Sequence, residues 1–345
     1  MGGDAHEKGE EKGMQALVYL GKENMEYREL DDPRPGPGEA VVRVAACGIC
    51  GSDMHGYHGY DPRRIPPMIM GHEFAGVVET GPMTGKRVTV NPLLTCGRCN
   101  ACISGAPQLC EEQRNIGLPP HAGAFADKVV VREANLVPIP DEMDFVTAAL
   151  SEPVAVAYHA VRIATRLSDR PLSARRIAVL GGGAIGLATA LVALSQGARQ
   201  VFLGETNANR RATARSANGD IVAYEPGGAD EPAIASVDLV FDAVGAQATR
   251  EAAFRMTRRG GTIVHLGLLP GGDGVDVRRL TLAEIAFVGS YCYSTIDFRE
   301  TVALLASGGL GPLNWVETRK MSDGAAAFAA LDRGLADAAK LVLVN

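Results

Sequence analysis

The sequence predicts an α/β protein with two domains, a β-barrel-like domain followed by a doubly wound parallel sheet. Three observations support this prediction. The chain has 345 residues, more than one small core usually organises. Short alternating strands broken by Pro and Gly fill its first part, whereas strands alternate with helices in its second part. A glycine-rich turn, "GGGAIG", separates a buried strand from an apolar helix in that second part.

The first domain is expected to cover residues 14–152. Alternating apolar and polar residues predict strands in "QALVYL", "EAVVRVAAC", "FAGVVET", "KRVTV" and "FADKVVV". Strands this short, joined by turns rich in Pro and Gly such as "DDPRPGPGE", are typical of an antiparallel barrel. The preceding residues 1–13, "MGGDAHEKGEEKG", are polar and charged, so we expect a flexible extension there.

The second domain is expected to cover residues 153–294. Its strands are predicted in "RIAVL", "QVFLG", "IVAY", "VDLVFDAVG", "GGTIVHLGL" and "EIAFVGSY", with helices between them. Residues 295–345 return to a mixed character, with two helices and a last strand, "AKLVLVN". We expect this tail to pack back onto the first domain, although the sequence alone would equally allow a short appendage.

Charge and hydropathy exclude two classes of partner. The net charge is −6 and the basic residues form no stripe, which argues against binding nucleic acid. No apolar run is long enough to span a bilayer, since the longest, "AIGLATALVAL", follows the glycine-rich turn and is expected to be a buried helix. The polar N-terminus is not a secretory signal, so we expect a cytoplasmic protein with reduced thiols.

Four of the seven cysteines lie in one short stretch. Cys96, Cys99, Cys102 and Cys110 have the spacing C-x2-C-x2-C-x7-C. Four thiolates close the coordination sphere of zinc and leave no position for a substrate, so the lobe over about 92–114 is expected to hold a structural zinc. A redox dithiol or a coincidental grouping are the alternatives; the first would need a βαβ context that is missing here.

Three other segments carry possible metal ligands. They are "GICGSDMHGYHG", "MGHEFAGVV" and "ALSEPVAV", and their polar residues are Cys50, Ser52, Asp53, His55, His72, Glu73 and Glu152. One Cys, one His and one carboxylate with a vacant fourth position compose a catalytic zinc site. Spacing alone does not show that the segments meet, and it equally allows a hydrogen-bonded core histidine and an inert buried thiol.

Taken together, these motifs resemble the zinc-containing medium-chain dehydrogenase/reductase family, which includes alcohol, polyol and threonine dehydrogenases. From about Met14 to the C-terminus, "GICGSD", "GHEFAGVV", the cysteine lobe, "EP" and "GGGAIG" occur in that family's order. The resemblance implies a GroES-like catalytic barrel and a Rossmann cofactor domain. It also implies zinc-dependent transfer of a hydride from a secondary alcohol to NAD, reversibly giving a ketone. The motifs are most similar to those of sorbitol-like polyol dehydrogenases.

The resemblance implies roles for the metal-binding candidates. Cys50 and His72 would bind the catalytic zinc, and Glu73 would be the third ligand, as in polyol-type members. Glu152 stands where simple alcohol dehydrogenases place a third zinc-binding cysteine, so it would bind zinc directly or through a metal-bound water. Which glutamate is the resting ligand stays open. Asp53 would orient His72, because zinc-binding histidines usually have such a partner.

Ser52 and His55 match the family's proton relay, in which a hydroxyl beside the zinc passes a proton on towards a surface histidine. A histidine can accept and release a proton near pH 7. The alternative for Ser52 is a helix cap, and the alternative for His55 is an ordinary surface residue. Cys47, three residues before Cys50, falls on a strand position and is expected to be packing.

The substrate class follows from the polyol-like ligand set. We expect a secondary alcohol with neighbouring hydroxyls, such as a sugar alcohol, a cyclitol, a sugar or a vicinal diol. Tyr57, Phe125 and Tyr291 are candidates for the pocket wall on position only, and ordinary packing is about as good an explanation. Arg63 and Arg64 could recognise a phosphate or carboxylate, although such a pair is more often simply solvated.

The glycine-rich turn is the expected cofactor site. Gly181, Gly183 and Gly186 fit G-x-G-x-x-G between a strand and a helix, where the backbone can approach a pyrophosphate. A purely structural turn is the alternative. Glu205 ends the next strand and would accept hydrogen bonds from the ribose, which favours NAD over NADP. The residues expected along the cofactor are Gly181, Gly183, Ala184, Ile185, Gly186, Glu205, Arg210, Val244, Leu266 and Gly267.

Arg210 matches the basic residue that the family places beside the adenosine, or it is a solvated helix residue. Together with Arg211 it leaves a dual cofactor preference open. His265 is expected to pack beside the cofactor rather than carry a proton. The "EIAFVGSY" strand falls where family members pair sheets, so a homodimer or homotetramer is expected.

Two other functions compete with the polyol interpretation. Within the class, the chain could be a simple alcohol dehydrogenase or an L-threonine dehydrogenase. From another class, it could be a non-catalytic relative that binds zinc and NAD. Such a relative would be expected to lack Cys50, His72 or Ser52, and all three are present.

Overall fold

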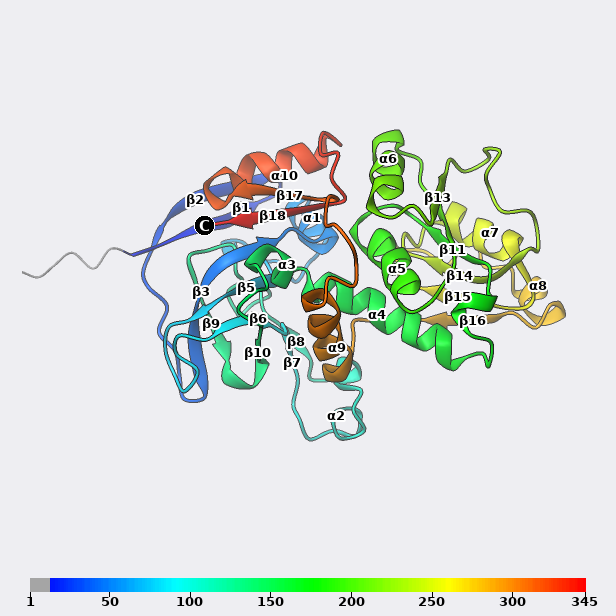
Figure 1. Cartoon of the computed structure of the whole chain (residues 1–345). Helices are drawn as coiled ribbons and strands as arrows, with labels where there is room; N and C mark the ends of the chain where they lie inside the picture. Colours follow the sequence, from blue (N-terminus) through cyan, green and yellow to red (C-terminus); the bar gives the residue numbers. More distant parts are fainter. Residues whose placement is uncertain (1–12) are drawn as a thin grey trace, which may run out of the picture.

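The computed structural model describes residues 13–345 and forms two lobes joined by a long helix (Figure 1). The expected extension over residues 1–13 lies outside the described residues except for Gly13. The helices are α1 (Gly51–Tyr57), α2 (Asn100–Ile103), α3 (Phe145–Ala149), α4 (Ser151–Arg166), α5 (Ala184–Ser195), α6 (Ala208–Ala217), α7 (Gln247–Met256), α8 (Val277–Leu282), α9 (Thr295–Ala306) and α10 (Gly324–Asp332).

Most of the strands fall where alternating or continuous apolar patterns occur in the sequence. In the first lobe and the tail they are β1 (Met14–Gly21), β2 (Asn24–Leu30), β3 (Glu39–Gly48), β4 (Met68–Ile69), β5 (Glu73–Val78), β6 (Arg87–Val90), β7 (Leu93–Leu94), β8 (Arg114–Asn115), β9 (Lys128–Arg132), β10 (Leu136–Pro138), β17 (Val316–Lys320) and β18 (Lys340–Val344). In the second lobe they are β11 (Ile177–Leu180), β12 (Val201–Gly204), β13 (Ile221–Tyr224), β14 (Val237–Asp242), β15 (Thr257–His265) and β16 (Ala286–Gly289).

The first lobe is a barrel-like arrangement around β3. Its largest sheet has the order β10-β6-β5-β3-β18-β17, with β9 also paired to β3. A three-stranded sheet, β2-β1-β4, lies beside it, and the short pair β7-β8 carries the cysteine lobe. Apolar side chains that alternate along β1, β3, β5 and β9 form one core cluster between these strands.

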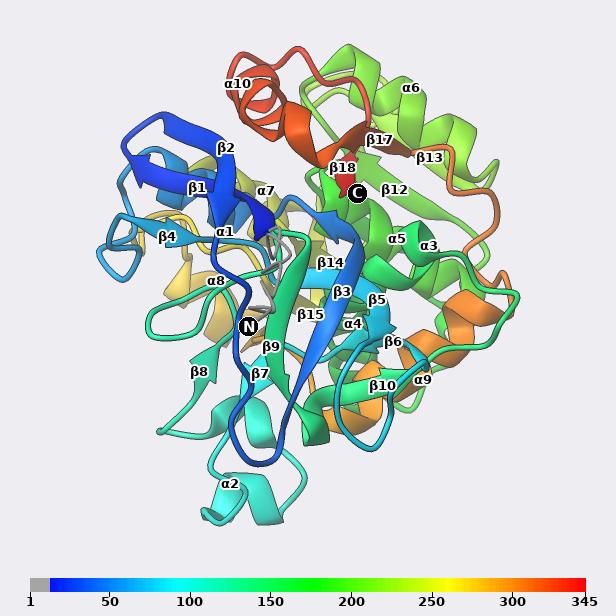
Figure 2. The ribbon, with the colours of Figure 1, turned by 90° about the vertical axis from the view of Figure 1, so that its left-hand side faces the viewer.

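The end of the chain returns to this first lobe. Strand β18 pairs antiparallel with β3, and α10 contacts β2, so these late segments lie beside the earliest strands (Figure 2). Strands β17 and β18 are parallel to each other, which is a departure from the purely antiparallel barrel that the sequence predicts. The reason is that α10 forms the crossover between them, and a crossover connection permits a parallel pair.

The second lobe is a six-stranded parallel sheet covered on both faces. Its order is β13-β12-β11-β14-β15-β16, which reverses direction between β11 and β14. Ile177 and Val179 of β11 pack in one apolar cluster with α4 and α5, whereas Ala178 and Leu180 pack in another with α7. Ligands bind such doubly wound sheets at the carboxyl ends of the strands beside the point where the order reverses.

Among residues 13–345, no helix has both the length and the apolar content that crossing a bilayer requires. The most apolar helix, α5, is a 12-residue helix in the core of the second lobe, as its position after the glycine turn predicts.

Candidate active site

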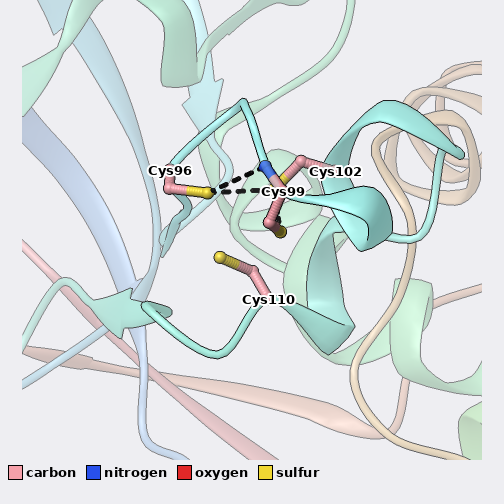
Figure 3. A group of neighbouring side chains, drawn as sticks. All are labelled: Cys96, Cys99, Cys102 and Cys110. Carbon is pink, nitrogen blue, oxygen red and sulfur yellow. Dashed lines mark hydrogen bonds between the residues drawn. The ribbon is translucent and has the colours of Figure 1, made fainter.

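The four clustered cysteines meet in a lobe at the edge of the first domain. Cys99 precedes α2, Cys102 lies within it, and Cys110 follows a short 3-10 helix, Pro107–Leu109. Figure 3 shows the four side chains pointing toward one another. Their sulfur atoms all lie within 4.8 Å of each other, so the loops already bring four soft ligands to one point.

The sulfur spacing suits a tetrahedral metal ion better than a disulfide. The Cys99 and Cys102 sulfurs are 3.5 Å apart, and those of Cys96 and Cys102 are 3.9 Å apart. Sulfurs bound tetrahedrally to zinc at 2.3 Å are separated by about 3.8 Å, whereas a disulfide needs about 2.05 Å. Backbone N–H groups of Arg98 and Cys99 lower the pKa of the Cys96 thiol to about 6, which favours the thiolate that a metal requires.

The second cluster is buried and its donors come from separate segments. Cys50 is the N-cap of α1, His72 directly precedes β5, and Glu73 is the first residue of β5. One ligand atom from each lies within 4.8 Å of the others. His72 and Glu73 are buried, and Cys50 is half-buried. A thiolate, an imidazole and a carboxylate in this arrangement fit a zinc ion with one position left for a substrate.

The charges around His72 favour a cation at this point. Burial by itself lowers the pKa of His72, but the charges of Asp53, Cys50 and Glu152 outweigh it and raise the pKa to about 10. The Asp53 carboxylate lies 3.6 Å from Nδ1 of His72. Its other oxygen accepts a hydrogen bond of 3.1 Å from the backbone N–H of Cys50, which closes a capping box. Asp53 is therefore the N3 residue of α1 and contacts two of the metal-binding candidates.

The buried carboxylate of Glu73 has a partner that sequence reasoning missed. Lys340, at the start of the last strand β18, forms an ion pair with Glu73 and donates a hydrogen bond of 2.8 Å to the carbonyl of Ile49. Both charged side chains are almost fully buried. Lys340 lies 267 positions after Glu73 in the chain, so no local pattern relates them. The one signal in the sequence was a lysine in a strand otherwise made of Leu and Val, which indicates a buried charge that needs a partner.

Glu152 lies near the metal-binding cluster but is not one of its three donors. It occupies the first turn of α4, where its carboxylate accepts a 2.9 Å hydrogen bond from the hydroxyl of Tyr293. Burial raises the pKa of Glu152 to about 7, and the charge of Glu73 acts in the same direction. Tyr293 belongs to the segment between β16 and α9, so this bond joins the two domains at the site.

Ser52 and His55 lie one turn apart on α1. Ser52 is half-buried and His55 is exposed. Ser52 is not the helix cap, because the sulfur of Cys50 takes that position and accepts from the Ser52 N–H at 3.5 Å. The hydroxyl of Ser52 instead accepts a hydrogen bond from Arg64 at 3.1 Å.

The structure places two of the three pocket-wall candidates in the core of the first lobe. Tyr57 and Phe125 are buried there and both rings pack against Phe328, as the packing explanation predicts. Tyr291 is 46% exposed, and its hydroxyl accepts a hydrogen bond of 3.4 Å from Gln113 of the cysteine lobe. The cysteine lobe therefore contacts the second domain beside the site.

Arg63 and Arg64 do not form a solvated pair. Arg63 is exposed and holds Asp61, but Arg64 is buried in the first domain beside Ser52. Cys47 is fully buried in the barrel core, in agreement with the packing role expected for it.

The glycine-rich loop fits a pyrophosphate. Gly181 has φ +100, and a Cβ on Gly186 would lie 1.9 Å from the carbonyl oxygen of Gly181, so both positions need glycine. A Cβ on Gly183 would meet nothing within 4 Å, so open space adjoins the loop there. Gly183 is the N-cap of α5, and no side chain caps this helix. Ala184 and Ile185 begin α5, whose free N–H groups suit an anionic group.

The carboxylate of Glu205 follows β12 and is bound to the same loop. One of its oxygens accepts a 2.8 Å hydrogen bond from the N–H of Gly182, and the other accepts one from the N–H of Asn207. Arg211 donates to the backbone carbonyl of Glu205, whereas the buried Nε of Arg210 has no hydrogen-bond partner among the described residues. Glu205 is thus fixed at the end of β12 beside the glycine-rich loop, and Arg210 is the arginine whose Nε stays unpaired among the described residues.

The ends of β14 and β15 pack closely together at this edge of the sheet. A Cβ on Gly267 would lie 2.0 Å from the backbone carbon of Val244, so the segments that carry Val244, Leu266 and Gly267 touch through their backbones. His265 packs edge-on against Phe287, with its Nε2 atom 3.7 Å from Asp242. These contacts agree with the packing role expected for His265.

A barrel with an open, buried donor set beside a dinucleotide-binding sheet defines the class of zinc-dependent, nicotinamide-linked dehydrogenases. Family models agree with the assignment. Residues 36–141 match the alcohol dehydrogenase GroES-like domain, and residues 184–307 match the zinc-binding dehydrogenase domain.

Known proteins give the same result. The chain is 31% identical over 336 residues to a 2-dehydro-3-deoxy-L-galactonate 5-dehydrogenase of Pseudoalteromonas atlantica, covering 92% of this chain and 95% of the relative. It is 33% identical over 314 residues to an L-threonine 3-dehydrogenase of Sinorhizobium medicae, covering 86% and 89% of the two chains. A zinc-binding dehydrogenase of Sinorhizobium meliloti 1021, solved with NADP, superposes with a TM-score of 0.85 at 30% identity, over 96% and 99% of the chains.

The chain therefore belongs to the zinc-containing medium-chain dehydrogenase/reductase family. The family and the fold class predicted from the sequence are both confirmed.

Proposed function

We propose that this protein is a zinc-dependent dehydrogenase that oxidises a secondary alcohol bearing neighbouring hydroxyls to a ketone, with NAD as the hydride acceptor. One observation carries the proposal: Cys50, His72 and Glu73 bring one donor atom each to a buried point at the junction of the two domains. Three protein donors leave a position that a substrate oxygen can occupy. A closed set of four would leave none, as in the cysteine lobe.

The donor set supports Cys50, His72 and Glu73 as the residues that would hold the catalytic zinc. Zinc bound there would act as a Lewis acid and lower the pKa of a substrate hydroxyl. Asp53 would orient His72, and Lys340 would balance the charge of Glu73. Glu152 stays the alternative third ligand, since its carboxylate is buried beside the cluster and its charge acts on His72.

Ser52 and His55 are proposed to move the proton that leaves the substrate. The Ser52 hydroxyl lies two residues from Cys50 and can accept a proton while it passes its own to the next acceptor. His55 is exposed on the same helix, where its imidazole can pass a proton on to solvent. A Ser52→Ala variant that oxidises substrate as fast as the unchanged protein would remove Ser52 from this role.

The loop from Gly181 to Gly186 is proposed to hold the pyrophosphate, and Glu205 the ribose. The dinucleotide supplies the hydride acceptor of the reaction. A carboxylate at the ribose repels a 2′-phosphate, which supports NAD over NADP. Because the solved relative holds NADP and Arg210 lies nearby, the cofactor assay should compare both dinucleotides at equal concentration.

The substrate class rests on the donor set and on the similar proteins together. A 2-dehydro-3-deoxy-L-galactonate dehydrogenase acts on a sugar acid, and an L-threonine 3-dehydrogenase acts on an amino acid with a secondary hydroxyl. We propose a polyol or a sugar derivative as the substrate of this chain, with L-threonine and simple alcohols as the competing choices.

A substrate panel tests the proposal. Zinc-loaded protein is mixed with NAD or NADP and with sugar acids, sugar alcohols, cyclitols, vicinal diols, L-threonine and primary alcohols, and formation of the reduced nicotinamide is followed by absorbance. We expect the fastest reduction with a secondary alcohol flanked by hydroxyls and with NAD. Binding of dinucleotide without reduction by any member of the panel would favour the non-catalytic alternative.

We also propose that the cysteine lobe holds a structural zinc, because its four sulfurs already lie within 4.8 Å of one another.

We further propose that the protein forms a homo-oligomer. Among residues 13–345, strand β16 pairs with β15 alone, so it is an edge strand of the sheet with unpaired main-chain groups along one side. Large apolar side chains are exposed in the neighbouring segments at Leu268, Val277 and Leu282. An edge strand with apolar surroundings supports pairing with a second copy, which sedimentation or light scattering would test.

A further inference from the structure

One residue of the loop after α1 is turned into the protein. Arg64 is buried, although Arg63 and Ile65 on either side of it are exposed. A guanidinium is rarely buried in a domain unless it is paired and hydrogen-bonded. Arg64 is not a metal ligand, so its burial needs another explanation.

The route of this side chain depends on a glycine. A Cβ on Gly56 of α1 would lie 2.1 Å from Cδ of Arg64 and 2.9 Å from its Nε. No other residue type fits there unless Arg64 moves. Glycine lowers the stability of a helix relative to alanine, but at this position it leaves room for the Arg64 side chain.

The guanidinium ends between two residues of the site. Its Nη2 atom donates to the hydroxyl oxygen of Ser52 at 3.1 Å. Its Nη1 atom lies 3.2 Å from Oδ1 of Asp53, the same oxygen that lies 3.6 Å from Nδ1 of His72. Arg64 thus contacts the hydroxyl proposed to take the proton and the carboxylate proposed to orient a zinc ligand.

The chemistry of arginine determines which group donates the hydrogen bond between Arg64 and Ser52. Arginine only donates hydrogen bonds, so it occupies one lone pair of the Ser52 oxygen and cannot accept the Ser52 proton. The hydroxyl must therefore donate to another group, while its second lone pair stays free to accept a proton. A lysine, with one compact ammonium, could not hold Ser52 and Asp53 with the same planar fork.

We propose that Arg64 is a positioning residue of the dehydrogenase, which holds the Ser52 hydroxyl and the Asp53 carboxylate in the orientations that proton transfer and His72 require. The inference rests on the proposed function of Ser52. Arg64 also ties the loop that precedes β4 to the site, because its Nε lies 3.4 Å from Asp61 of that loop.

The first test compares Arg64→Met with Arg63→Gln. Arg63 is the matched control, because it is the adjacent arginine of the same loop and its exposed side chain binds the carboxylate of Asp61 rather than Ser52 or Asp53. On the best substrate of the panel, kcat of Arg64→Met should fall by roughly 10- to 100-fold with a much smaller change in KM. Arg63→Gln should keep kcat close to that of the unchanged protein. Equal kcat for Arg64→Met and the unchanged protein would overturn the proposal.

A double-mutant cycle separates positioning from general support of the fold. If Arg64 acts through Ser52, then Arg64→Met should cost far less kcat in a Ser52→Ala background than in the unchanged protein. The same loss in both backgrounds would show that Arg64 acts elsewhere and would contradict the inference. Gly56→Ala provides a second variant that keeps every charge but displaces the Arg64 side chain, and it should reproduce the loss of kcat.

A readout without turnover keeps the inference testable if no substrate is found. With cobalt in place of zinc, the visible spectrum reports the geometry of the donor set. Arg64→Met and Gly56→Ala should shift this spectrum through Asp53 and His72, whereas Arg63→Gln should not. An unchanged spectrum together with unchanged cobalt affinity would overturn the positioning of His72. Absence of turnover in the unchanged protein, with the spectral shifts present, would instead count against the proposed function alone.

Discussion

The two metal-binding clusters are built in opposite ways. The cysteine lobe takes its four sulfurs from one stretch of 15 residues, and three of the four are only half-buried. The second cluster takes its donors from two separate segments, and partners such as Lys340 and Glu152 come from distant parts of the chain. Local spacing makes the first a closed set of like ligands. The tertiary fold makes the second a buried, open set of unlike ligands, and only an open set can hold a substrate.

The largest expected effect separates the two clusters by activity. Cys50→Ala should lower kcat/KM by at least about 10³-fold, because the lost Lewis acid supplies several kcal/mol of transition-state stabilisation. The substitution should lower the thermal unfolding temperature less than loss of the zinc of the cysteine lobe does. Cys47→Ala is the control, since this neighbouring thiol is buried in the barrel core outside the donor set. Comparable activity of both variants would remove Cys50 from the catalytic site.

The opposite pattern is expected for the lobe. Cys102→Ser should lower the free energy of unfolding by several kcal/mol, because structural zinc contributes its binding energy to folding. The fraction that stays folded should keep most of its kcat. Denaturant unfolding would measure the loss of stability, metal analysis the loss of zinc, and steady-state kinetics the kcat of the folded fraction. A variant with unchanged stability but little activity would reverse the roles assigned to the two clusters.

A third prediction concerns the buried ion pair that supports the open site. In metal-free protein, Lys340→Met should lower the free energy of unfolding by about 3 kcal/mol or more, because the Glu73 carboxylate is then left buried without a cation. Adding Glu73→Gln should recover part of this loss, since the uncompensated charge is then removed. Lys340→Arg serves as the charge-conserving comparison. If the double variant is as unstable as the sum of the single variants, then the pair does not couple as described.

The smallest effect compares two thiols in metal-free protein: Cys96 of the cysteine lobe, and Cys292, which lies between β16 and α9 next to Tyr293. The pKa of Cys96 is lowered to about 6 by backbone N–H groups, whereas burial and the charge of Glu152 raise the pKa of Cys292 to about 12. The thiolate fraction rises with pH through the pKa, so alkylation of Cys96 should reach its plateau above pH 6. Allowing for the greater nucleophilicity of the more basic thiolate, Cys96 should react roughly a hundredfold faster at pH 7. Peptide mapping after iodoacetamide treatment would measure both rates.

The cysteine lobe could be predicted from the sequence in more detail than the second cluster, because its ligands lie close together in the chain. The spacing of Cys96, Cys99, Cys102 and Cys110 is local, so a shared metal could be inferred from the residues alone. The glycine turn is equally local, and strand and helix periods predict the doubly wound sheet. The expectations for the fold agree with the family and the fold class of the chain, whereas the shared metal of the four cysteines stays a prediction.

The open site could not be derived in the same way. The spacing of Cys50, His72 and Glu152 in the sequence does not show that these residues lie close together in the fold. Only the resemblance in the order of the motifs indicated that they do. The sequence did not indicate Lys340 as a partner of Glu73, nor the contacts of Arg64 with Ser52 and Asp53. Each depends on the tertiary fold, through β18 for Lys340 and past Gly56 for Arg64. Phe125 was a candidate for the pocket wall, but it is buried in the core of the first lobe.

Anomalous diffraction at the zinc edge, from crystals of the protein grown with zinc and NAD, tests the central claim most directly. The account predicts two peaks in each chain. One should lie among the sulfurs of the cysteine lobe, and the other should lie within bonding distance of Cys50 and His72, with Glu73 or Glu152 as the acidic ligand. A single peak in the lobe, with no metal at Cys50 and His72, would contradict the assignment of this protein as a zinc-dependent dehydrogenase.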